Sequence, residues 1–376
     1  MIKSIYADAD TSIYEKTGSL NAGLDSLLEL SKVSSSAGIF TSRMLINFQL
    51  DSISASIAAG DITNPSFYIN LYSTNVKEAP LEYALIAHPL SQSWSNGVGR
   101  ILEPISQNGY IKDGSSWIYR DKQDVTTKYV ATKDTQWTSQ SLVTGTEIKY
   151  SSVTGGGTWY SNYYGTQSFE QETSDLRMNV TPVINYILST KGANGKYIND
   201  GIIIMRSGSQ ETDAKSYGNI SFFSRETNTV YQPRLEVVYD DSEFNSSGLN
   251  ELTSDQSVLY VKNLKHEYTT KERPKIRVIG RDRYPSKTFS TQSNYKTINF
   301  LPTSSYYGVK DALTEEFILP YSSVGTKLSC DSGGNFFKLD MDSFMPERYY
   351  KLSFQVTQSD ASVVVYDENF YFKVVR

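Results

Sequence analysis

The stretch Ile220 to Asp241 reads ISFFSRETNTVYQPRLEVVYDD, two apolar, strand-like runs around a polar centre. Polar residues and Pro233 between such runs predict a turn, and proline does least harm at a strand start because it has no N–H to donate. Arg225 and Glu226 are adjacent, so in a strand their side chains point to opposite faces and form no single reactive pair. We predict the last hairpin of a β-domain that ends near Asp241.

Similar strand-like runs recur along the 376 residues. The 28 Tyr and 16 Phe, with abundant Ser and Thr, favour strands because aromatic and β-branched side chains fit a pleated surface. In RMLINFQL (43–50), Met44, Ile46 and Phe48 alternate with Leu45, Asn47 and Gln49, as a half-buried strand requires. The sequence therefore predicts an all-β protein.

Only two stretches have helical features. NAGLDSLLELSK (21–32) has weak helical spacing and fits a loop followed by a strand equally well. TPVINYILST (181–190) follows Asn179, a capping residue, and predicts a short helix.

The chain is longer than one hydrophobic core usually supports, so we expect two domains. Short strands separated by turns predict a β-sandwich in each, the first at 1–242 and the second, immunoglobulin-like or related, at 258–376. Residues 243–257 are polar and predict a linker. A long polar segment at about 103–172 predicts an insertion into the first domain.

Bulk properties exclude several classes of protein. The net charge of −5 gives no reason to expect a nucleic-acid partner or a polybasic membrane anchor. Cys330 is the only cysteine, so no disulfide forms within the chain. The first residues contain no apolar signal region, and no window approaches 18 apolar residues, so folding in the cytoplasm of the producing cell is expected.

Catalytic patterns are weak, and we predict that the chain is not an enzyme. His88 and His266 lie outside any metal-ligand or triad spacing, and the glycine run at 155–157 lacks the GK[ST] of a phosphate loop. No cofactor is expected. A carboxylate glycosidase is the third hypothesis, because it needs only two acids at a defined separation. The acids considered are Asp8, Asp10, Glu15, Asp240, Asp241, Glu315 and Glu316.

Four aspartates raise the possibility of a structural calcium ion. Asp8 and Asp10 lie near the start of the first strand, and Asp240 and Asp241 end the last strand of the same predicted domain. If these strands are neighbours, their carboxylates converge on a cation that takes six to eight oxygen ligands. Solvated strand ends are the alternative.

The predicted insertion is rich in aromatic residues. Exposed, they would form a platform that stacks on sugar rings; buried, they would pack the insertion against the sandwich or contact another subunit. The residues concerned are Trp117, Trp137, Trp159, Tyr160, Tyr163 and Tyr164.

Residues 251–300 are basic. Ten Lys and Arg against five Asp and Glu give this segment a net charge of +5, which leaves −10 for the rest of the chain. Such polarity favours head-to-tail contact between subunits or an acidic partner, and a solvated strand face is the alternative.

The order of motifs in the first domain resembles a known family. ADADTSIYEKTGSLNAGLDSLLEL, SRMLINFQLDSI, SQSWSNGVGR, DLRMNVTPVINYIL and SFFSRETNTVYQPRLEVVYDD follow one another as in carbohydrate-binding-module-like jelly-roll domains related to disaggregatases. The similarity covers about residues 5–242 and implies a jelly-roll sandwich. Such domains are found on secreted surface proteins and in phage virion proteins.

The second domain, with ERPKIRVIGRDRYPSKTF and KLSFQV, is similar to the C-terminal part of virion structural proteins of large tailed phages, cyanophages among them. Together the resemblances imply a virion protein of the neck, tail or capsid surface, made in the bacterial cytoplasm. Its expected partners are other virion proteins and copies of itself, with no nucleic acid or membrane. A glycan-binding adhesin that recognises the host surface is the alternative.

Overall fold

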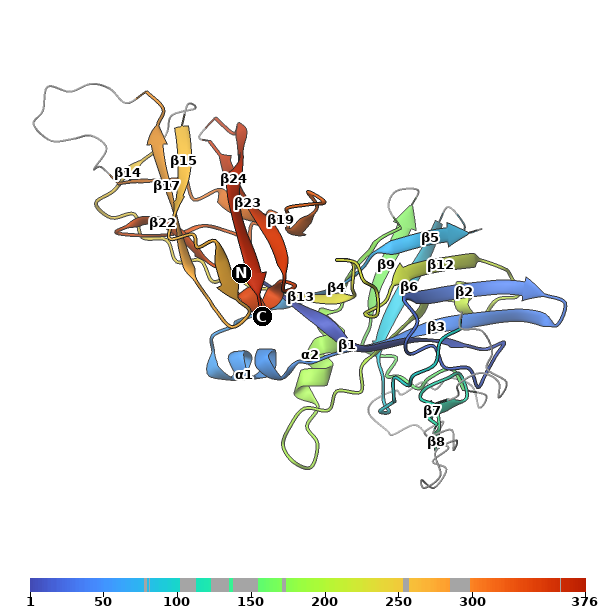
Figure 1. Ribbon diagram of the computed structural model, residues 1–376. Helices are drawn as coiled ribbons and strands as arrows, with labels where there is room; N and C mark the ends of the chain where they lie inside the picture. Colours follow the sequence, from blue (N-terminus) through green and yellow to red (C-terminus); the bar gives the residue numbers. More distant parts are fainter. Residues whose placement is uncertain are drawn as a thin grey trace, which may run out of the picture. The chain divides into compact units, whose positions relative to one another are not determined.

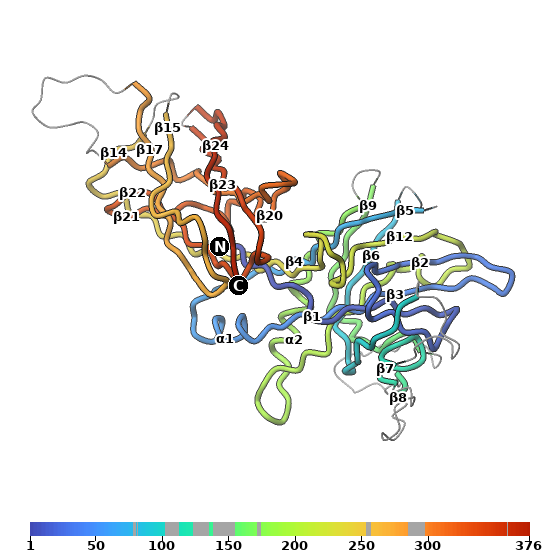
Figure 2. Tube along the Cα trace, in the orientation of Figure 1, coloured from blue at the N-terminus to red at the C-terminus, as the bar shows by residue number. Residues whose placement is uncertain are grey.

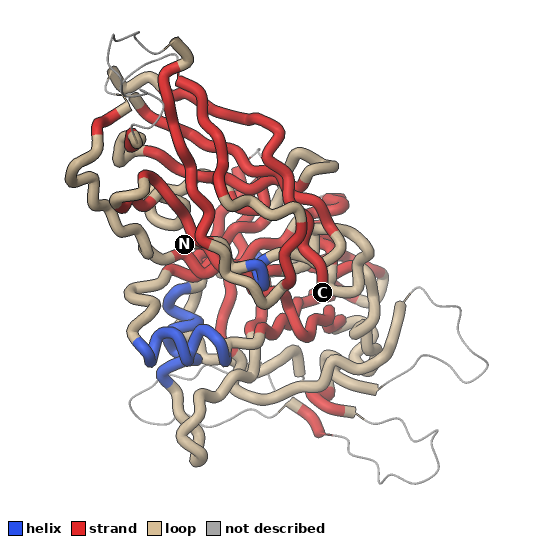
Figure 3. The backbone as a smooth tube through the Cα atoms, turned by 60° about the vertical axis from the view of Figure 1, so that its left-hand side comes forward, coloured by secondary structure: helices blue, strands red, loops and turns tan. Residues whose placement is uncertain are grey.

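The structure, a computed structural model, describes residues 1–77, 80, 82–101, 113–122, 135–137, 155–170, 174–252, 257–284, 298–358 and 360–376 (Figure 1). Strands dominate, and the few helices are short, which confirms the predicted all-β class (Figure 3). The chain forms two compact units. The N-terminal unit comprises Ile5–Ala55 and Ser66–Glu236, and the C-terminal unit comprises Met1–Ser4, Ser56–Pro65 and Val237–Arg376. No helix among the described residues is long and apolar enough to cross a membrane.

One branched sheet system builds the N-terminal unit. Its main path runs β10-β4-β13-β1-β3-β11-β6-β9, and β2, β12 and β5 branch from β3. The strands are β1 (Ile2–Tyr14), β2 (Leu27–Ser35), β3 (Gly38–Phe48), β4 (Ser66–Leu71), β5 (Ser73–Lys77), β6 (Glu82–Pro89), β9 (Gly165–Glu170), β10 (Leu176–Asn179), β11 (Ile202–Arg206), β12 (Gly218–Phe223) and β13 (Arg234–Val238). The short strands β7 (Tyr119–Asp121) and β8 (Thr135–Gln136) pair with each other.

Strand β3 changes partners half-way along. Its first residues pair with β2 up to Thr41, and from Ser42 onward it pairs with β1. At the split the Ser42 hydroxyl accepts a hydrogen bond from the Ser31 N–H at 2.7 Å and donates one to the Glu29 carbonyl at 2.9 Å. A side chain thus replaces the backbone partners that β2 loses, as buried backbone groups require.

The predicted hairpin at the end of the first domain does not form. β12 pairs with β2 and β5, whereas β13 lies between β4 and β1, so the two strands belong to different branches. The intervening residues are a crossover. In this turn the Arg225 guanidinium and Glu226 carboxylate form an ion pair at 3.1 Å, because β12 ends at Phe223 and the strand rule for opposite faces does not apply.

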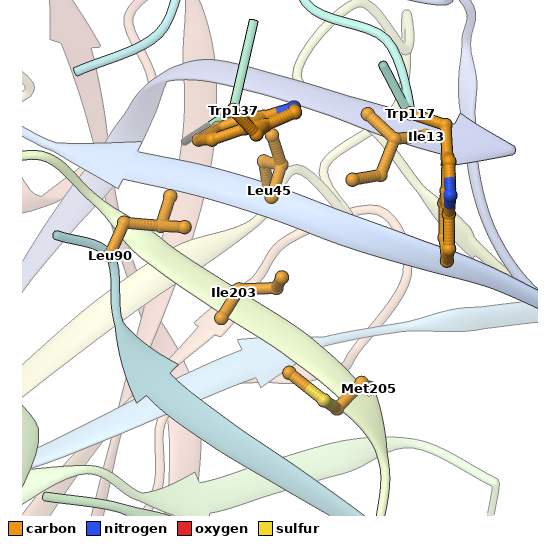
Figure 4. Close-up of a cluster of buried hydrophobic side chains, with 7 residues drawn as sticks. All are labelled: Ile13, Leu45, Leu90, Trp117, Trp137, Ile203 and Met205. Atoms are coloured by element: carbon orange, nitrogen blue, oxygen red, sulfur yellow. The ribbon is translucent and has the colours of Figure 1, made fainter. Parts of the chain in front are cut away.

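Strand β3 is buried on both faces, which corrects the expectation of a half-buried strand. Met44, Leu45 and Ile46 are all fully buried. Met44 and Ile46 face one side, and Leu45 joins the cluster of Ile13, Leu90, Ile203, Met205, Trp117 and Trp137 on the other (Figure 4). The predicted insertion supplies the two tryptophans and covers the second face.

The helices are α1 (Asp51–Ala59), α2 (Thr181–Ser189), α3 (Ser209–Thr212) and the 3-10 turn η2 (Met341–Ser343). α2 confirms the predicted short helix, and the Asn179 side chain accepts a hydrogen bond from the Thr181 N–H at 3.0 Å. The other ambiguous stretch becomes strand β2. α1 has no apolar stripe, since only Ile53 is buried, and the sequence therefore gave no helical signal there.

Two sheets pack together in the C-terminal unit (Figure 2). One has the order β15-β17-β22-β21 and the other β16-β24-β23-β19-β20, with β14-β18 as a small extra pair. Phe337 stacks on Tyr307 across the sheets at 4.4 Å between ring centroids. The strands are β14 (Asn250–Glu251), β15 (Ser257–Lys262), β16 (Glu267–Thr269), β17 (Lys275–Asp282), β18 (Asn299–Phe300), β19 (Ser305–Asp311), β20 (Phe317–Leu319), β21 (Ser329–Asp331), β22 (Gly334–Lys338), β23 (Arg348–Thr357) and β24 (Val363–Val375).

The described residues of the predicted linker, 243–252, are part of the C-terminal unit. Phe244 bridges to Cys330 and packs edge-on against Phe300 at 5.9 Å, and Leu252 is buried. The N-terminal residues also belong here. The Lys3 ammonium lies 3.2 Å from the Asp340 carboxylate, and both side chains are buried. These segments are therefore held in the C-terminal unit by specific contacts and do not form a free connection.

The hydroxyl of Ser42 should be required at the sheet split. Ser42→Ala removes these two hydrogen bonds and a third from the Ser31 hydroxyl at 3.0 Å, and it takes a partner from the half-buried Ser31 N–H and Glu29 carbonyl, so we expect a loss of about 1–3 kcal/mol. All four tryptophans lie in the N-terminal unit, so urea unfolding followed by tryptophan fluorescence reports on it. The exposed turn variant Ser36→Ala should change stability by less than about 0.5 kcal/mol. Equal effects of the two variants would contradict this role.

Candidate functional site

The structure divides the six predicted aromatic contact residues into two groups. Trp117 and Trp137 are only 5% and 7% exposed and belong to the core cluster (Figure 4). The Trp137 indole N–H donates to the Ser116 carbonyl at 2.9 Å, which satisfies its one polar group. These two residues therefore pack the insertion against the sandwich, and their rings have no free face for a ligand.

Arg43 fastens the insertion to β3. Its guanidinium carbon lies 4.7 Å from the Trp117 ring centre and 5.1 Å from that of Trp159, and its Nε donates to Glu211 at 2.8 Å. Burial raises the pKa of Glu211, and the nearby Arg43 charge partly offsets this rise. A cation between two indoles is attracted by both ring faces.

The glycine run at 155–157 has a steric cause. All three residues have φ between +89° and +106°, a region that disfavours side chains. A Cβ on Gly155 would lie 2.1 Å from the Trp117 carbonyl oxygen, and one on Gly156 would lie 2.8 Å from the Trp117 ring. The run lets the backbone pass directly over this tryptophan.

The remaining four predicted aromatics gather at the surface with His88, which the sequence analysis considered only as a catalytic or metal-binding candidate, and with Tyr186, which it did not single out. Trp159 and Tyr164 flank the His88 ring at centroid distances of 6.2 and 6.1 Å. Tyr163 stacks on Tyr186 of α2 at 4.0 Å, and Tyr160 packs against the same ring at 4.9 Å. We call this set the aromatic cluster: His88, Trp159, Tyr160, Tyr163, Tyr164 and Tyr186.

The aromatic cluster is open at one edge. Tyr164 is 52% exposed, while Trp159, Tyr160 and Tyr163 are half-buried. His88 Nδ1 lies 3.0 Å from the Tyr163 carbonyl oxygen, and burial lowers the pKa of the histidine, so it is neutral near pH 7. A neutral ring held by a backbone carbonyl serves packing. No sequence pattern could have paired Tyr186 with Tyr163, because the contact depends on where α2 lies.

The four predicted calcium ligands are divided between the units, Asp8 and Asp10 in the N-terminal unit and Asp240 and Asp241 in the other. Asp241 accepts a hydrogen bond from the Met1 ammonium at 2.6 Å, and Asp240 caps the Ser242 N–H at 2.9 Å. Across the described ranges, no three His, Cys, Asp or Glu side chains lie close enough together to hold a metal ion.

Asp10 has an unusual environment. The carboxyl group is almost fully buried, and Oδ2 accepts a hydrogen bond from the Arg225 N–H at 2.7 Å. Oδ1 has no hydrogen-bond partner among the described residues. Burial raises the pKa of Asp10 to about 7, and the hydrogen bond and charge of Arg225 only partly offset this rise. In the crossover, Arg225 thus binds the buried carboxyl group of Asp10 through its backbone N–H.

The other candidate catalytic groups have structural partners. Glu15 accepts a hydrogen bond from the Thr41 N–H at 3.0 Å. Glu315 has φ +60° in the turn between β19 and β20, and its carboxylate lies 3.6 Å from the Lys351 ammonium. His266 packs edge-on against Tyr349 at 6.1 Å. These contacts assign each group a place in the fold.

Two small cavities flank Tyr14 at the sheet split. The inner one, about 70 Å³, includes Asp25 and Glu29, and the Tyr14 hydroxyl donates to Glu29 at 2.9 Å. The outer one, about 180 Å³, is lined by Phe40, Val33 and several hydroxyls. Both are smaller than the roughly 300–1,000 Å³ of ordinary ligand pockets.

No protein-family model matches the chain, and no curated protein matches it.

Asp10 should make the N-terminal unit less stable as pH rises. Its pKa is about 7 when folded and about 3.9 when unfolded, so between these values the folded state binds the extra proton. Its contribution to stability is complete below about pH 4 and is lost as pH rises through 7, by up to about 4 kcal/mol. Asp10→Asn keeps the hydrogen bond from Arg225 and should flatten this slope in urea unfolding. The same slope in Asp10→Asn as in the unaltered chain would contradict the assignment.

Proposed function

We propose that this chain is a structural protein of a tailed bacteriophage virion, part of the neck, tail or capsid surface. It acts through contacts with other virion proteins and with copies of itself, needs no cofactor, and is made in the bacterial cytoplasm. The resemblance of its segments to virion proteins supports this proposal. So does the all-β fold, whose candidate catalytic groups are engaged in structural contacts.

The observation that carries the proposal is a strip of exposed apolar side chains in the C-terminal unit. Buried residues alternate along β24, and the outward-facing Val363 and Val365 are 54% and 52% exposed. Tyr371 and Tyr349, on β24 and β23, continue the same outer face at 40% and 49%. Exposed apolar residues on adjacent strands are typical of a protein contact surface. We call these four residues the apolar strip.

A groove adjoins one end of the apolar strip. It has a volume of about 630 Å³, includes Tyr349, and is bordered by Leu313, which is 88% exposed. The Arg348–Asp311 ion pair, at 3.5 Å, lies in its wall. The projecting Leu313 can insert into a partner as an apolar anchor, and the groove beside it can accept a side chain of that partner.

Purified particles should contain the chain. We expect its peptides in the mass spectrum of virions purified by density gradient, at a fixed ratio to the other virion proteins. Val363→Asp/Val365→Asp should reduce incorporation, because burying two carboxylates in a contact is costly. The matched control is Val33→Asp/Val76→Asp, which changes two exposed strand valines of the N-terminal unit. Purified virions without the chain would overturn the proposal.

Glycan binding at the aromatic cluster is the second candidate function. The half-exposed Tyr164 ring and the adjacent Tyr163 and Trp159 offer apolar faces with polar edges, which suit sugar rings. In this reading the chain recognises the host surface, with Trp117 and Trp137 supporting the cluster from the core.

Glycan binding predicts a signal on a host-glycan array that depends on Tyr164. Tyr164→Ala should weaken it by about tenfold, the effect of one lost stacking contact of 1–2 kcal/mol. Tyr284→Ala, which removes a 76% exposed tyrosine of the C-terminal unit, should leave it unchanged. Absence of binding at millimolar glycan would count against this candidate.

A further inference from the structure

The outer face of the sheet β15-β17-β22-β21 is strongly cationic. Ile276 and Val278 of β17 point into the core, so Lys275, Arg277 and Arg281 face outward. The neighbouring strands add Lys262 and Lys338, both exposed. We call these five residues the cationic face.

Like charges lie directly opposite each other on the cationic face. Lys262 of β15 is in register with Arg277 of β17, and Lys275 is in register with Lys338 of β22. Such cross-strand pairs destabilise a sheet by about 0.2–1 kcal/mol each. Among the described residues of this face, Asp331 is the one acid, and it bonds both Lys275 and Arg277 at 2.7 Å. One carboxylate against five cations leaves this face with a net positive charge.

The other sheet of the same unit does not carry this excess of positive charge on its outer face. Lys310 and Lys351 both pair with Asp367, at 2.8 and 2.9 Å, and Lys373 pairs with Glu347 at 2.7 Å. Lys310 and Lys351 are also directly opposite each other, but they share Asp367 and lie 3.9 and 3.6 Å from Glu315, so these three lysines contact three carboxylates. Two faces of one sandwich, built from similar strands, therefore differ in whether their charges are neutralised internally.

The N-terminal unit carries an acidic counterpart. Glu82 of β6 is in register with Glu170 of β9, and both are exposed. This like-charged pair also costs stability. Outside residues 251–300 the chain carries a net charge of −10, so each copy offers acidic surface to a basic neighbour.

We propose that the cationic face of one copy binds the acidic surface around Glu82 and Glu170 of a second copy. This inference rests on the proposed assembly function and names its partner. Binding places opposite charges against three like-charged pairs and relieves the repulsion within each. Tyr260, which is 44% exposed and lies beside the cationic residues on β15, supplies apolar contact at the same surface.

The contact joins two different surfaces, so it is heterologous. Repetition of a heterologous contact gives a ring if the rotation closes and a filament if it does not. Either product is suited to a particle component present in many copies.

Charge reversal tests the contact without threatening the fold. Lys262→Glu/Lys338→Glu converts both like-charged pairs into opposite-charged ones, so the variant should fold at least as stably while its cationic face is neutralised. Glu82→Lys/Glu170→Lys reverses the acidic surface. Lys191→Glu/Lys196→Glu, two exposed loop lysines elsewhere, is the control with the same charge change as the first variant.

Sedimentation velocity on the full chain should show concentration-dependent association at about 50 mM salt that disappears near about 500 mM. The control should associate like the unaltered chain, and each reversed variant alone should associate at least about tenfold more weakly. Mixing the two reversed variants should give a dimer that does not extend, because one keeps the acidic surface and the other keeps the cationic face.

Three results would overturn the inference: unaltered association of either reversed variant, no dimer in the mixture, or no self-association of the unaltered chain at low salt. In the last case, binding of a labelled single-stranded oligonucleotide that is lost in Lys262→Glu/Lys338→Glu would assign the face to nucleic acid instead. If virions contain the chain but copies do not associate, only the partner is wrong. If copies associate but virions lack the chain, the proposed function fails.

Discussion

The N-terminal unit depends on strand β3, which must satisfy three neighbouring strands and two covered faces within eleven residues. Consecutive residues divide this work. Ser42 replaces the backbone partners lost where β2 and β1 diverge. The Arg43 guanidinium lies between the indoles of Trp117 and Trp159 and so holds the predicted insertion on β3. Met44 and Leu45 then fill opposite cores. The alternation of side chains along a strand is what lets one segment serve both faces.

The sequence predicted what is encoded locally. Alternation found β3, and Asn179 marked the start of α2, where its side chain, one residue before the N-cap Val180, accepts a hydrogen bond from the Thr181 N–H. Two strand-like runs near the C-terminus, SVVVYD (362–367) and NFYFKVV (369–375), form the single strand β24, since the irregular pairing between Leu352 and Phe354 absorbs the polar residues between them. Such a bulge leaves little signal in a single sequence.

The rest depends on contacts between distant residues. Trp117 and Trp137 are as aromatic as Tyr164, and only the path of the insertion over β3 decides which rings are buried. The predicted hairpin failed for the same reason, because the partner of a strand is not encoded in the turn before it. The linker was polar in composition, yet Phe244 and Leu252, together with backbone hydrogen bonds to Cys330 and Phe300, attach its described part to the C-terminal unit.

Charge placement links the fold to the proposed function. A sheet that only has to fold gains when carboxylates neutralise its outward-facing lysines, as Asp367 does for the directly opposed Lys310 and Lys351. The cationic face and the Glu82–Glu170 pair forgo that gain in separate units. Exposed charges add little to affinity but suppress wrong partners and fix register, whereas apolar residues supply most of the binding free energy. In the proposed assembly the apolar strip would therefore supply most of the binding free energy, and the charged surfaces would select which surface of the neighbouring subunit is bound.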